Sequence, residues 1–122
     1  MNAEATTHSH IEVTETLVRL YVFLAQDLDR CLDLAARQTY PEHELQSHLS
    51  STRATLMEML SVNQVVKGKV EKECNQVLSL AAACLTDGPG KTAALEELKT
   101  ERAVLKNKIT ALSDLLAVFR AA

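Results

Sequence analysis

The sequence is poor in aromatic residues, glycine and proline. Its 122 residues include no tryptophan, two tyrosines, two phenylalanines, three glycines and two prolines. An all-β fold needs a turn roughly every 8–12 residues, and glycine and proline supply many of those turns. The scarcity of both residues therefore argues against an all-β protein.

Other features are missing as well, and each absence excludes a class of protein. The three cysteines form no CxxC pair, and the N-terminus lacks the basic and apolar regions of a secretory signal. The longest apolar run, 80–85, is far short of the roughly 20 residues that span a bilayer. We therefore expect no membrane partner, and an intracellular protein with reduced thiols, located in the cytoplasm or alternatively in the nucleus.

The net charge and the apolar content exclude further classes of protein. The net charge is −3 and the sequence pI is about 5.8, whereas proteins that bind nucleic acid are usually basic. We therefore expect no nucleic-acid partner. Hydrophobic residues make up 47% of the chain, which argues against intrinsic disorder. Many leucines and alanines with few aromatics favour helices packed by aliphatic side chains.

Apolar residues recur in steps of three and four along three segments, which is the spacing of a heptad repeat. The first series is Leu17, Tyr21, Leu24, Leu28, Cys31 and Ala35. We predict an all-α fold, an antiparallel bundle or coiled coil of three long helices at about 10–38, 42–85 and 92–120. Residues 1–9 are predicted to be a flexible tail, and 10–122 a single domain.

The middle segment allows two interpretations. Its heptad phase continues without a reset across 61–68, which favours one long helix from 42 to 85. Gly68 and the stretch 61–63 are weak helix formers, so a bend or break there is the alternative and would give four helices.

Short connections between helices predict antiparallel neighbours. If the chain folds back at 39–41, the numbers of facing residues in the first two segments add up to about 80. If it folds back at Gly88, those in the last two segments add up to about 177. This register is staggered and predicts exposed apolar seams at 42–52 and 74–84, which a second copy or another helical chain would cover.

Four polar residues interrupt the apolar series: Thr52, Asn63, Glu73 and Arg102. Glu73 and Arg102 come close to facing positions, so one interpretation is an ion pair across the interface. Asn63 is a candidate for fixing the register, as buried asparagine does in coiled coils. The alternative is that these groups point to water.

No catalytic, cofactor-binding or metal-binding residues are predicted. The segment 88–92 ends like a phosphate-binding loop, but Leu85 stands where the first glycine is required and no strand precedes it. His43 and His48 are five residues apart, so a helix points them apart, and we expect histidines to face solvent. The cysteines are expected to pack as small core residues.

The pattern favours a non-enzymatic interaction subunit, a scaffold or adaptor of a multiprotein assembly. It would bind partner helices, or a second copy in a homodimer, through exposed heptad seams. The candidate binding residues are Leu45, Leu49, Leu56, Val77, Leu80, Leu98, Leu105, Leu112, Leu116 and Phe119. The alternative function is a small helical chaperone for a secretion or flagellar export substrate.

Overall fold

A computed structural model describes residues 3–36, 42–85 and 88–121 of the chain. They form four helices: α1 (Ala3–Ala36), α2 (Glu42–Val62), α3 (Gln64–Cys84) and α4 (Lys91–Ala121). None of the described residues forms a strand, which confirms the all-α prediction. The predicted fold-back at 39–41 lies outside the described residues.

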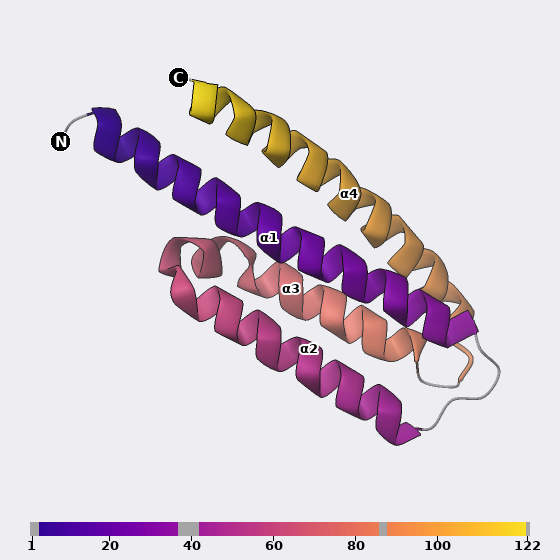
Figure 1. Ribbon diagram of the computed structural model, residues 1–122. Coiled ribbons are helices and arrows are strands. Elements are labelled where there is room, and N and C mark those ends of the chain that lie inside the picture. The colour runs from indigo at the N-terminus through magenta and orange to yellow at the C-terminus, as the bar shows by residue number, and fades with distance from the viewer. Residues whose placement is uncertain (1–2, 37–41, 86–87, 122) are drawn as a thin grey trace.

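Each helix runs antiparallel to the one before it, and both ends of the chain lie at the same end of the molecule (Figure 1). α1 packs most extensively against α4, and α3 contacts all three other helices. α2 lies against α3 and touches α1 only lightly. α1 and α4 are the longest helices, and they extend past the tip of the α2–α3 hairpin (Figure 1).

The middle segment is two helices, so the preference for one long helix is wrong and the four-helix alternative is correct. Asn63 is the single residue between α2 and α3, and its backbone is extended, with φ −139° and ψ 108°. Its side-chain Oδ1 accepts hydrogen bonds from the backbone N–H of Val65 and Val66 at 3.0 and 3.2 Å. These bonds satisfy donors that the first turn of α3 leaves unpaired.

The break at Asn63 also removes the predicted stagger. Because α3 folds back along α2, the seam expected to be exposed at 74–84 is covered by the protein's own helices. Cys74, Val77 and Cys84 are all buried. In the other expected seam, Leu49 is half-buried and Thr52 is buried.

The core lies along the axis that α1, α3 and α4 share, with α2 closing one side. Its fully buried leucines are Leu20, Leu24, Leu28, Leu56, Leu60, Leu98 and Leu105. All seven belong to the apolar series or flank it, so the heptad spacing identified the interior faces of the helices.

The helix boundaries differ from the predicted ones at the N-terminus. α1 begins at Ala3 and so includes residues that we expected in a flexible tail. The C-terminal helix matches the prediction closely. Within the described residues, no helix has the length and apolar character that crossing a membrane requires.

Candidate functional site

A buried polar cluster lies between α1 and α2. Asp27 and Cys31 stand one turn apart on α1, and His48 and Thr52 stand one turn apart on α2. One turn of separation places both members of each pair on the same face of their helix. Asp27 lies opposite Thr52 and Cys31 lies opposite His48, which is the register predicted for these two segments.

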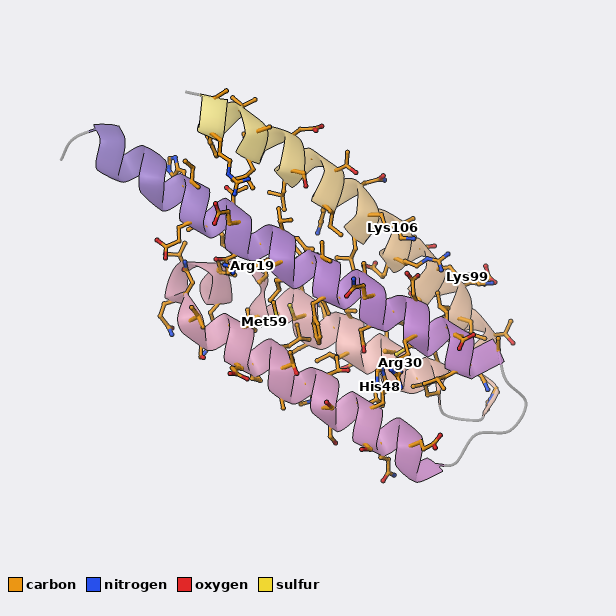
Figure 2. The ribbon with its side chains drawn as sticks, viewed as in Figure 1. Arg19, Arg30, His48, Met59, Lys99 and Lys106 are labelled. Atoms are coloured by element: carbon orange, nitrogen blue, oxygen red, sulfur yellow. The ribbon has the colours of Figure 1, made fainter. Side chains whose placement is uncertain are left out.

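Asp27 is the centre of this cluster. Its Oδ1 accepts a hydrogen bond from Thr52 Oγ1 at 2.8 Å and lies 2.8 Å from His48 Nε2. Cys31 Sγ is 3.8 Å from Asp27 Oδ2 and 3.8 Å from His48 Nε2. Asp27 is 7% exposed, Cys31 is fully buried, and the His48 side chain is 15% exposed. His48 extends from α2 into the gap between the helices (Figure 2).

The geometry does not fit a cysteine nucleophile. Burial, followed by the negative charge of Asp27, raises the pKa of the Cys31 thiol to about 12. A nucleophilic cysteine needs a lowered pKa and access to solvent, and Cys31 has neither. Cys31 and Asp27 also approach the same nitrogen of His48, whereas a catalytic relay uses one ring nitrogen for each partner.

What the cluster does offer is three different donor atoms in one place. The thiol sulfur, the imidazole nitrogen and a carboxylate oxygen all lie within 4.8 Å of one another. The expectation that His48 faces solvent is therefore wrong. The sequence could have indicated that His48 meets Cys31, because residues whose numbers add up to about 80 face each other in the predicted register.

A second polar group joins three helices. Glu73 of α3 accepts a hydrogen bond from the Tyr21 hydroxyl of α1 at 3.0 Å and forms an ion pair with Lys108 of α4. The Lys108 ammonium also lies 5.5 Å from the centre of the Tyr21 ring. The predicted Glu73–Arg102 pair is wrong, because Arg102 pairs with Asp29 at 3.1 Å instead. Glu73 thus faces a position about two turns further along α4 than expected.

Large apolar side chains are exposed on α4 and at the tip of the α2–α3 hairpin. Val62 is 80% exposed and Val65 is 56% exposed, on either side of Asn63. On α4, Val118 is 65% exposed and Leu115 is 43% exposed. Leu115 follows Lys108 by one heptad, so both lie on the side of α4 that meets α3. We call Val62, Val65, Leu115 and Val118 the exposed apolar row.

The predicted partner-binding residues lie mainly inside the bundle. Leu56, Val77, Leu98, Leu105 and Leu116 are buried by the protein's own helices. The half-buried ones are Leu49, Leu80, Leu112 and Phe119. The Leu45 side chain lies outside the described part of the structure.

No protein-family model, curated protein or solved structure matches this chain. Its function is therefore inferred from its own side chains.

Proposed function

We propose that the protein is a non-enzymatic helical interaction protein, a scaffold or adaptor that binds a helix of another chain or of a second copy. The observation that carries this proposal is the exposed apolar row, in which Val62 is 80% and Val118 is 65% exposed. Single exposed apolar residues are ordinary, but several large ones on helices that pack against one another favour an interaction site.

The position of the row favours a helix as the partner. α3 begins at Gln64, whereas α4 continues to Ala121 beside α1 (Figure 1). Leu115 and Val118 therefore lie near the level where α3 begins, on the side of α4 that α3 covers further along. A partner helix that continues the path of α3 would contact α4 with the same heptad spacing that α3 uses.

A charged pair includes Arg120, which lies two residues beyond Val118 on α4. Arg120 of α4 pairs with Glu15 of α1 at 2.6 Å, and both are partly exposed. An apolar centre with charged groups at its edge is the usual composition of a protein interface.

Self-association is the form of this proposal that the purified protein can test. We expect the mass measured by light scattering to increase with protein concentration, and a Leu115→Glu, Val118→Glu double variant to remain monomeric. The matched control is Ala103→Glu with Thr110→Glu, which adds the same charges at exposed positions of α4 outside the row.

If the protein is monomeric, the same two double variants are compared for the proteins that co-purify with them from a native lysate. A partner lost by the row variant and kept by the control variant supports the adaptor role. A monomer whose co-purifying proteins are unchanged by the row variant would contradict the proposal.

A further inference from the structure

We propose that Asp27, Cys31 and His48 bind one divalent transition-metal ion of the zinc class at the interface between α1 and α2. This inference does not depend on the proposed interaction function, because the cluster is buried and lies apart from the exposed apolar row.

The donor set suits zinc. Thiolate sulfur, imidazole nitrogen and carboxylate oxygen are its usual protein ligands, and a thiolate disfavours magnesium and calcium, which prefer oxygen. A thiolate and a carboxylate together carry two negative charges, which a divalent ion neutralises. Neutralisation matters here because Asp27 and Cys31 are buried, and buried charge is costly unless it is compensated.

The three donor atoms all lie within 4.8 Å of one another, a little farther apart than the ligands of a tetrahedral zinc site. With typical zinc–ligand bond lengths, a sulfur and a nitrogen or oxygen ligand lie about 3.6 Å apart, and a nitrogen and an oxygen ligand about 3.3 Å apart. Cys31 Sγ lies 3.8 Å from His48 Nε2 and 3.8 Å from Asp27 Oδ2. His48 Nε2 lies 2.8 Å from the other carboxylate oxygen, Asp27 Oδ1, so the carboxylate must turn to bring one of its oxygens into a tetrahedral arrangement with the sulfur and the nitrogen.

Proton movements accompany binding. The Cys31 thiol gives its proton to the buffer and binds as the thiolate. His48 carries its proton on Nδ1 in the bound form, which turns the Nε2 lone pair towards the ion. Because the His48 side chain is 15% exposed, its side of the cluster gives the ion a path from solvent and leaves the fourth position open to water.

Thr52 is a positioning residue in this scheme. Its hydroxyl donates to Asp27 Oδ1 at 2.8 Å and so orients the carboxylate without needing to touch the ion. Bound metal would link α1 to α2, which of all the packed helix pairs contact each other least. We therefore expect the ion to stabilise the attachment of α2.

The test uses the full chain, reduced and stripped of metal with a chelator, and titrated with Co²⁺ as a spectroscopic substitute for zinc. We expect one equivalent to produce the visible bands of a tetrahedral site and a thiolate-to-cobalt charge-transfer band in the near ultraviolet, and Zn²⁺ to displace both. Cys31→Ser should abolish the charge-transfer band, and His48→Gln should weaken binding by about 100-fold or more.

Two control variants and two further measurements make the assignment specific. Cys74→Ser removes another buried thiol, and His10→Gln removes an exposed histidine, and both should bind Co²⁺ like the unaltered protein. Thr52→Val should weaken binding by about 10-fold while keeping the charge-transfer band. Saturating Zn²⁺ should raise the unfolding temperature of the unaltered protein but not that of Cys31→Ser.

Two results would overturn the proposal. The first is the absence of a charge-transfer band in the unaltered protein, which would leave the cluster as a structural hydrogen-bond group. The second is a metal response that survives Cys31→Ser and disappears with His10→Gln, which would assign it to adventitious binding near the N-terminus. The unaltered protein alone decides the first outcome, so the test stands even if a variant fails to fold.

Discussion

Cys74 is a fully buried thiol of α3 that lies outside the polar cluster. Burial, followed by the nearby charges of Glu73 and Glu71, raises its pKa from 9.0 to about 11. The unfolded chain lacks this environment and releases the thiol proton at a lower pH. Between about pH 9 and pH 11 the folded state therefore holds more protons than the unfolded state, and its stability falls as the pH rises.

The stability of the protein above pH 9 should depend on the Cys74 thiol. Between pH 9 and pH 11, the urea midpoint of the unaltered protein should fall more steeply than that of Cys74→Ala, because the variant has no thiol to ionise at that position. Both proteins are measured in the presence of chelator, so that metal binding does not contribute. Parallel curves over this pH range would show that the Cys74 thiol has the same pKa in both states.

Glu73 shows how one side chain can organise several elements. Its two carboxylate oxygens face different helices, one towards Tyr21 of α1 and the other towards Lys108 of α4. The Lys108 ammonium in turn lies near the Tyr21 ring, so each of the three groups contacts the other two. The sequence marked Glu73 as unusual because it interrupts an apolar series, but its partners depended on the relative shift of α3 and α4.

At the scale of the elements, Asn63 decides how many helices there are. Its side chain caps the first turn of α3, and alanine at this position would leave the backbone N–H groups of Val65 and Val66 without that acceptor. We expect Asn63→Ala to lower the free energy of unfolding by about 1 kcal/mol. Chemical denaturation monitored by circular dichroism measures this change.

Asn63→Asp is the matched control for the cap. Its carboxylate oxygen accepts the same two hydrogen bonds and its negative charge is favourable at a helix N-terminus, so we expect stability close to that of the unaltered protein. Equal losses for the alanine and aspartate variants would show that the cap contributes little to stability.

At the scale of the whole molecule, stability comes from the core in which α1, α3 and α4 meet. Leu105 is 1% exposed in this core, while the adjacent Val104 is 37% exposed. Leu105→Ala should lower the free energy of unfolding by about 2–5 kcal/mol, because it removes buried apolar contacts and leaves a cavity. Denaturant unfolding gives the value directly.

Val104→Ala is the control, since it truncates a neighbouring side chain of the same helix that is partly exposed and not fully buried. Its effect should be well below that of Leu105→Ala, at about 1 kcal/mol or less. A loss for Val104→Ala as large as that for Leu105→Ala would mean that α4 buries a different face from the one described.

Much of the architecture was predictable because heptad spacing is a local property. Leu24, Leu28 and Cys31 were assigned to the interior from their spacing, and all three are buried. The sequence favoured one long helix over a break at Asn63. A one-residue connection adds no loop residues, so the heptad spacing of the apolar residues continues across it without interruption. The alternative of a break at 61–68 rested only on weak helix formers.

The helical class, the interior faces of the helices and the register between α1 and α2 could be read from the spacing of the apolar residues. Packing in three dimensions was needed to show that α3 folds back on α2, that Glu73 meets Lys108, and that Asp27, Cys31 and His48 share one buried space. The physical reason is that apolar periodicity specifies which side of a helix is buried, whereas the site depends on which helix covers that side. That choice is made by packing among all four helices at once.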